Sequence, residues 1–190
     1  MTLPVYLVRH GQSTWNVLRL TQGQTRHPPL TVDGRHQAAV AAEVIARDVE
    51  ASGRRVDRIL SSDLVRAVQT ADVLAERLGA VVTLEPRLRE QHLGTLQGRG
   101  YAETWAHAEQ HDWSDPSLPV AGGEAVRDVH ARMVGVMAER DAAELTVLVS
   151  HGDAIRAAIA HLKGTEPHVA PWVDVANGSV ARFIDDLAWL

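Results

Sequence analysis

Two apolar segments that lie far apart in the chain each end in the dipeptide His-Gly. The first, Val5–Val8, continues as Arg9-His10-Gly11. The second, Val147–Val149, continues as Ser150-His151-Gly152. Short apolar runs of this kind indicate buried strands of a parallel sheet. Because such a sheet binds its ligands at the carboxyl ends of its strands, the repeated ending predicts two imidazoles in one crevice.

Arg9 adds a fixed positive charge beside the first of these histidines. Its guanidinium presents a planar set of donors that suits phosphate, and no obvious set of metal-binding carboxylates accompanies it. Histidine and arginine together favour a pocket for a dianion, with an imidazole placed to attack it. Taken alone, Arg9-His10-Gly11 is also compatible with a strand end whose histidine only bonds its neighbours.

Helical and strand-like patterns alternate along the chain. We expect strands at 3–8, 59–61, 81–84 and 146–149, helices at 31–52, 64–78, 101–111, 126–136 and 154–162, and a hairpin of 172–176 with 180–184 around Asn177-Gly178. Thr31 and Asp153 are the expected N-caps, and Gly79 is expected to end its helix. The pattern predicts one α/β domain over residues 1–190, a three-layer sandwich with a mostly parallel central sheet flanked by helices.

Composition narrows the class of protein. With 190 residues and a net charge of −5, the chain is not expected to bind nucleic acid or an anionic membrane surface. The absence of cysteine excludes disulfides and cysteine nucleophiles. Arg9 interrupts the first apolar run before it reaches signal-peptide length, and no segment is long enough to cross a bilayer. We therefore expect a cytoplasmic protein, and a homodimer stays open.

Arg66 lies in or near the first turn of the helix expected at 64–78. A positive charge there opposes the helix dipole, and an anion bound at the same end would remove the conflict. Asp63, three residues earlier, is an equally good partner for the guanidinium. The sequence leaves both interpretations open.

Residues 7–16, Leu-Val-Arg-His-Gly-Gln-Ser-Thr-Trp-Asn, resemble a motif of the histidine phosphatase (phosphoglycerate mutase-like) superfamily. Further motifs resemble that family in the same order and over nearly the whole chain: Gln22-Gly23 with Pro29-Leu30-Thr31, Gly34 with Gln37-Ala38, Ser61-Ser62-Asp63-Leu64 with Arg66-Ala67 and Gln69-Thr70-Ala71, Leu88-Arg89-Glu90 with Leu93-Gly94, and Ser150-His151-Gly152. The resemblance implies the phosphoglycerate mutase-like fold.

The resemblance also implies roles for single residues. His10 is the implied nucleophile, which forms a phosphohistidine, and Glu90 is the implied acid and base, which protonates the leaving alkoxide and then deprotonates water. The family pattern alone selects Glu90 among the 24 acidic residues. The phosphoryl oxygens would be bound, and charge in transfer stabilised, by a further set: Arg9, Asn16, Gln22, Gly23, Arg66 and His151. No metal and no cofactor are expected.

Within the family, the chain is more similar to the phosphatase branch. Phosphoglycerate mutases carry longer insertions that enclose the substrate, whereas the segment from Gly98 to the Gly122-Gly123-Glu124 turn is short here. His27 and Asp153 depart from common family residues, an Asp and a second Gly. We expect a metal-independent, acid-type phosphatase acting on phosphate monoesters of small metabolites. A mutase-type phosphotransferase is the alternative, and a non-catalytic relative would have lost residues that this chain keeps.

Overall fold

Six strands form one sheet in the computed structural model, which describes residues 3–190. Their order across the sheet is β3 (Val81–Leu84), β2 (Arg58–Ser61), β4 (Thr146–Ser150), β1 (Val5–Arg9), β5 (Val180–Phe183) and β6 (Leu187–Trp189). The first four run parallel, whereas β5 is antiparallel to both β1 and β6. The prediction of a mostly parallel sheet is confirmed.

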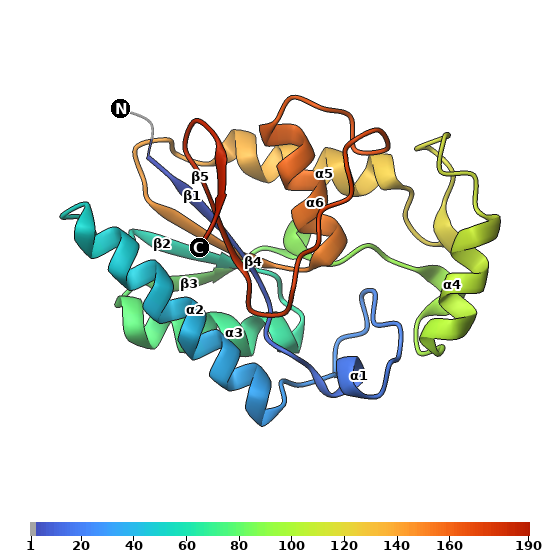
Figure 1. Cartoon of the computed structure of the whole chain (residues 1–190), viewed down its shortest axis with the longest axis horizontal. Helices are drawn as coiled ribbons and strands as arrows, with labels where there is room; N and C mark the ends of the chain where they lie inside the picture. The colour runs from blue at the N-terminus through green and yellow to red at the C-terminus, as the bar shows by residue number, and fades with distance from the viewer. Residues whose placement is uncertain (1–2) are drawn as a thin grey trace.

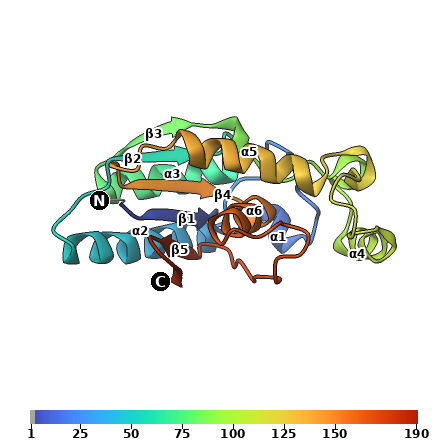
Figure 2. The same cartoon turned by 90° about the horizontal axis from the view of Figure 1, so that it is seen from above.

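Four helices cover the two faces of the sheet: α2 (Val32–Ala51), α3 (Val65–Leu78), α5 (Val126–Glu139) and α6 (Gly152–Leu162). Figures 1 and 2 show α2 and α3 on one side and α5 and α6 on the other. Val8 of β1 packs into the core beneath α2 and α3, and its neighbour Leu7 packs into the core beneath α5 and α6. Because both faces are buried, β1 needs apolar residues at successive positions. The three-layer sandwich is confirmed.

The remaining elements are short and lie toward the carboxyl ends of the parallel strands. They are α1 (Thr14–Val17), α4 (Tyr101–Gln110) and three short 3₁₀ helices, η1 (Pro86–Leu88), η2 (Gly94–Leu96) and η3 (Val120–Gly122). In both views α1 and α4 stand beyond the arrowheads of β1 and β4, with α4 farthest from the sheet. Over residues 3–190, none of the helices combines the length and apolar composition that crossing a membrane requires.

The predicted C-terminal hairpin is wrong in its first arm. Residues 172–176 form no strand, because β5 already pairs with β1 on one side and with β6 on the other. The Asn177-Gly178 turn packs instead against the end of β1. There the amide of Gly178 donates to the carbonyls of Arg9 and His10, both at 3.2 Å.

Of the three residues predicted to cap or end a helix, two are correct. The hydroxyl of Thr31 accepts the amide of Gly34 and caps α2, and Gly79 ends α3 in the left-handed conformation with φ +65°. Asp153 is not the N-cap of α6, because the helix begins at Gly152, two residues before the expected start, and His151 occupies the cap position. No side chain of the cap residue bonds the first turn, and the Glu90 carboxylate accepts those amides instead.

Candidate active site

The register of β1 against β4 places the two histidines side by side. Arg9 pairs with Ser150 across the strands, and the amide of His10 donates to the Ser150 carbonyl at 3.0 Å. The next residue of each strand is therefore a histidine at the same edge of the sheet. The ring centroids of His10 and His151 lie 5.0 Å apart, and both side chains are buried. The prediction of two adjacent imidazoles is confirmed.

The His10 ring is held so that one nitrogen is available as a nucleophile. Its Nδ1 lies 2.7 Å from the Gly11 carbonyl oxygen and donates to it, which leaves the lone pair on Nε2. The Arg66 Nε–H donates to that Nε2 at 3.3 Å. Burial and the charges of Arg66 and Arg9 lower the pKa of His10 well below its ordinary value. The imidazole is therefore neutral at physiological pH.

Gly11 and Gly34, which both belong to the sequence motifs described above, allow the loop after His10 to contact α2. A Cβ on Gly11 would stand 2.1 Å from the carbonyl oxygen of Gly34, and a Cβ on Gly34 would stand 2.0 Å from that of Gln12. No side chain fits at either position without moving the backbone. The Gly11 amide donates to Thr70 Oγ1 at 3.1 Å, which fixes this loop to α3 as well.

Arg66 is a buried cation, only 1% exposed. Its Nη1 donates to the Thr25 carbonyl at 2.9 Å and its Nη2 to the Gly23 carbonyl at 2.7 Å. The alternative partner considered from the sequence, Asp63, is wrong, because that carboxylate bonds Arg89 Nε at 2.6 Å. Burial lowers the pKa of Arg66 to about 10, so the guanidinium still carries its charge at neutral pH.

Neither Arg9 nor Arg66 forms an ion pair with a carboxylate within residues 3–190. Arg9 donates to the Val175 carbonyl, and its buried Nε has no partner in the described chain. His151 Nε2 lies 2.9 Å from Ser62 Oγ, while its buried Nδ1 is likewise unpartnered there. Buried cations and donors are costly unless they are paired. This cluster around His10 Nε2 is therefore suited to an anion.

Glu90 lies between the η1 turn and the start of α6. Its Oε1 accepts the amides of Gln91 and Asp153, both at 3.0 Å, and that of Ala154 at 3.3 Å. These contacts hold the carboxyl group and leave Oε2 outside the hydrogen bonds of residues 3–190. Burial and then the charge of Asp153 raise the pKa of Glu90, against the opposing effects of the Gln91 amide, Arg9 and Arg66. A carboxyl in this setting can hold a proton closer to neutral pH.

The other expected phosphate-binding residues line the loops beside His10. Asn16 Oδ1 accepts the amide and the hydroxyl of Ser13 at 2.9 and 3.0 Å, and it forms the capping box of α1. Gln22 Oε1 lies 2.8 Å from the same hydroxyl. Gly23 contributes its carbonyl to Arg66. Ser13 therefore joins Asn16 and Gln22, and both amide nitrogens stay free of short contacts within residues 3–190.

Some residues at the site escaped the sequence analysis. Asn177 Nδ2 donates to the His10 carbonyl at 3.1 Å and lies 3.5 Å from Asn16 Oδ1. Ser62 Oγ lies 2.9 Å from His151 Nε2 and orients the ring, whereas the sequence motif that contains Ser62 points only to Arg66. The Asn177-Gly178 pair predicts a turn but not its contact with the end of β1. No local sequence pattern indicates that Ser62 or Asn177 contacts a histidine.

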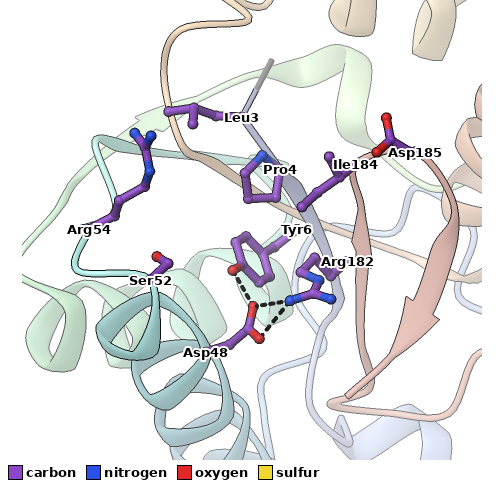
Figure 3. A pocket seen from close by; sticks show the side chains of 9 residues that line it. All are labelled: Leu3, Pro4, Tyr6, Asp48, Ser52, Arg54, Arg182, Ile184 and Asp185. Carbon is purple, nitrogen blue, oxygen red and sulfur yellow. Dashed lines mark hydrogen bonds and ion pairs between the residues drawn. The ribbon is translucent and has the colours of Figure 1, made fainter. Parts of the chain in front are cut away.

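A cavity of about 410 Å³ lies at the other end of the sheet, where Leu3 and Pro4 lead into β1 (Figure 3). Three of its polar side chains bond one another. Tyr6 Oη donates to Asp48 Oδ2 at 2.6 Å, and Arg182 Nη1 donates to Asp48 Oδ1 at 2.8 Å. No histidine lines this cavity. Across residues 3–190, no three side chains of metal-binding type gather as a metal site would require.

Comparisons with known proteins agree with this geometry. The chain is 32% identical over 189 residues to a protein of Photorhabdus laumondii named probable phosphoglycerate mutase GpmB, covering 95% of this chain and 84% of that one. The structure of mycobacterial glucosyl-3-phosphoglycerate phosphatase matches with TM-score 0.78 and 34% identity, over 96% of this chain and 90% of that one.

A phosphoserine phosphatase of Entamoeba histolytica, solved with 3-phosphoglyceric acid, matches with TM-score 0.81 and 25% identity, over 98% and 94% of the two chains. A family profile described as histidine phosphatase superfamily (branch 1) matches residues 5–185. The protein with paired histidines at the ends of β1 and β4 therefore belongs to the histidine phosphatase superfamily, branch 1.

Proposed function

We propose that this protein is a metal-independent, acid-type phosphatase that hydrolyses phosphate monoesters of small metabolites through a phosphohistidine on His10. One observation supports this most. The Nε2 of the neutral His10 accepts the buried Arg66, and the charge of Arg9 also acts on this ring, while neither arginine forms an ion pair with a carboxylate within the described chain. A phosphate dianion supplies the missing negative charge and brings its phosphorus to the nucleophile.

In the first step, the lone pair of His10 Nε2 attacks phosphorus and a P–N bond forms. The bond from phosphorus to the ester oxygen breaks, and Glu90 gives its proton to that oxygen, so that an alcohol leaves. Arg9, Arg66 and the free Nδ1 of His151 bind the three non-bridging oxygens. When Ser62 Oγ donates to His151 Nε2, the ring hydrogen lies on Nδ1, which can then donate it to a phosphoryl oxygen.

In the second step, water attacks the phosphohistidine. Glu90, now a carboxylate, takes a proton from the water as its oxygen bonds to phosphorus. The P–N bond breaks, inorganic phosphate leaves, and His10 and Glu90 return to their starting states. The net reaction converts a monoester and water into an alcohol and phosphate.

The names of the relatives support small phosphorylated metabolites as substrates, since both solved phosphatases are named for such compounds. The curated relatives named probable phosphoglycerate mutases support the alternative reaction. In a mutase the phosphoryl group on His10 would return to a second hydroxyl of the substrate instead of passing to water. The short segment between Gly98 and Gly122 favours the phosphatase, because it offers little chain to exclude water.

The test is release of inorganic phosphate from a panel of monoesters, including 4-nitrophenyl phosphate and 3-phosphoglycerate, with and without a chelator. We expect turnover in both conditions, with glycerate rather than 2-phosphoglycerate formed from the last substrate. His10→Ala should abolish turnover. Wild-type protein that is denatured during turnover should carry an acid-labile, base-stable phosphate, and His10→Ala should carry none. The exposed His36→Ala is the matched control. Turnover by His10→Ala, or activity restored only by a divalent ion, would refute the proposal.

A further inference from the structure

Four consecutive carbonyl groups around Glu90 are held by side chains and not by a helix or strand. Arg132 of α5 donates to the carbonyls of Arg87, Arg89 and Glu90, the last two at 2.6 and 3.0 Å. Ser150 Oγ donates to the remaining carbonyl, that of Leu88, at 2.7 Å. A single guanidinium therefore fixes most of the backbone that carries Glu90.

Glu124 holds this guanidinium in place. Its Oε1 accepts Arg132 Nε at 3.0 Å, and its Oε2 accepts Arg132 Nη2 at 3.1 Å and the His92 amide at 2.8 Å. The Arg132 side chain is only 14% exposed. The residue before Glu124 has to be a glycine, because a Cβ on Gly123 would stand 1.9 Å from the His92 carbonyl oxygen. The turn therefore packs directly on the segment after Glu90.

Gln24 connects this pair to the phosphate site. Its Nε2 donates to the Glu90 carbonyl at 3.0 Å and to Glu124 Oε2 at 3.1 Å. The residue before it is Gly23, whose carbonyl accepts Arg66. The loop that binds the buried Arg66 and the segment that carries Glu90 thus share one set of hydrogen bonds.

We propose that Arg132, held by Glu124, is a positioning residue for Glu90. It fixes the peptide from which the Glu90 carboxyl reaches the start of α6, so that Oε2 stays at the phosphoryl site. This inference rests on the proposed function, in which Glu90 transfers the proton. Arg132 itself bonds only protein groups, and it acts through Glu90.

The geometry requires arginine and not a positive charge alone. Three carbonyls and one carboxylate are bonded by the fixed planar donors of a guanidinium, whereas a lysine ammonium has three donors on a single atom. Without Arg132 the carbonyls of Arg87 and Arg89 lose their side-chain donor and that of Glu90 keeps only Gln24, so the segment between η1 and η2 can shift. A displacement of the reacting group by about 1 Å costs on the order of 10²-fold in rate.

The test compares two substrates in the phosphorylation step, measured by rapid quench. An alkyl phosphate needs a proton on its leaving oxygen, and 4-nitrophenyl phosphate needs little help. We expect Arg132→Met to slow the alkyl ester about 100-fold and the nitrophenyl ester less than about 10-fold, with Arg132→Lys between it and wild type. Arg182→Met is the matched control, since it breaks an arginine–carboxylate pair with Asp48 at the far end of the sheet. It should leave the ratio of the two rates unchanged.

A double variant separates positioning from general damage. When Glu90→Gln has already removed the acid, adding Arg132→Met should slow the alkyl ester by less than about 3-fold more. Equal losses on both substrates for folded Arg132→Met would overturn the inference, and if that variant does not fold, Glu124→Gln and Arg132→Lys carry the same comparison. If Glu90→Gln slows the alkyl ester more than the nitrophenyl ester but the Arg132 variant slows both equally, only the positioning role of Arg132 is refuted. If Glu90→Gln slows both esters equally, or if the wild-type protein releases no phosphate, the proposed mechanism is refuted as well.

Discussion

Replacing Glu90 by Gln removes the acidic proton while leaving the contacts of the group in place. The amide oxygen of Gln can accept the amides of Gln91, Asp153 and Ala154 that Oε1 accepts now. The atom that changes is Oε2, which becomes an NH₂ group that cannot give up a proton at neutral pH. Binding of the substrate phosphate to Arg9 and Arg66 should therefore change little.

The size of the effect depends on the leaving group. General acid catalysis contributes roughly 10²–10⁴-fold, and each tenfold corresponds to about 1.4 kcal/mol. An alkyl phosphate expels a strongly basic alkoxide, so Glu90→Gln should raise its phosphorylation barrier by about 3–5.5 kcal/mol. The nitrophenolate ion is stable without a proton, so that barrier should rise by less than about 1.4 kcal/mol.

Single-turnover rapid quench is the suitable assay, because Glu90 is also proposed to assist water in the second step. It measures phosphate on His10 before dephosphorylation can mask the difference. The control is Glu43→Gln, which removes a carboxylate from the surface pair with Arg77. Losses of equal size on the two esters would refute the reasoning, and the proton donor would then have to be another group.

Two further changes test the electrostatics and the core. Asp153→Asn removes a negative charge that raises the pKa of Glu90, so the Glu90 carboxyl should lose its proton at lower pH. The alkaline limb of the pH–rate profile for an alkyl phosphate should therefore move to lower pH, and a limb that stays in place would contradict this. Leu148→Ala empties a fully buried position of β4 and should lower the free energy of unfolding by about 2–5 kcal/mol in urea denaturation, whereas Val32→Ala, 84% exposed, should change it by less than about 0.5 kcal/mol.

The regular part of the fold could be predicted because local patterns agree with the tertiary structure. The strand at Val81–Leu84 and the helix that ends at Gly79 lie where the residues alone place them. The segment 172–176 could not be predicted, because its conformation depends on the edge of the sheet. There β5 and β6 take the pairing positions, and the Val175 carbonyl accepts Arg9 instead of bonding a strand.

The site could be predicted to the extent that its residues follow a strand or repeat a motif. His10 and His151 satisfy both conditions, and the register of β1 and β4 then brings them together. Glu90 needed the family resemblance, since its environment arises from the start of α6, more than sixty positions later in the chain. Arg132 had no local signal at all, because its partners lie on separate loops.

In the proposed mechanism, one site must hold a neutral nucleophile and a protonated acid at the same pH. Burial moves both groups in the needed directions, because it disfavours the charged form of His10 and also that of Glu90. The arginines help only the histidine, since their charge also favours a Glu90 carboxylate. The charge of Asp153 has the opposite effect and raises the pKa of Glu90.

A bound phosphate dianion extends this balance. Its negative charge offsets Arg9 and Arg66, and it therefore favours the protonated form of Glu90 at the stage when a proton has to be given to the leaving oxygen. After the alcohol leaves, the ionised Glu90 faces a phosphohistidine and the water that attacks it. The same carboxyl can therefore serve both steps, because the substrate itself contributes to setting its protonation state.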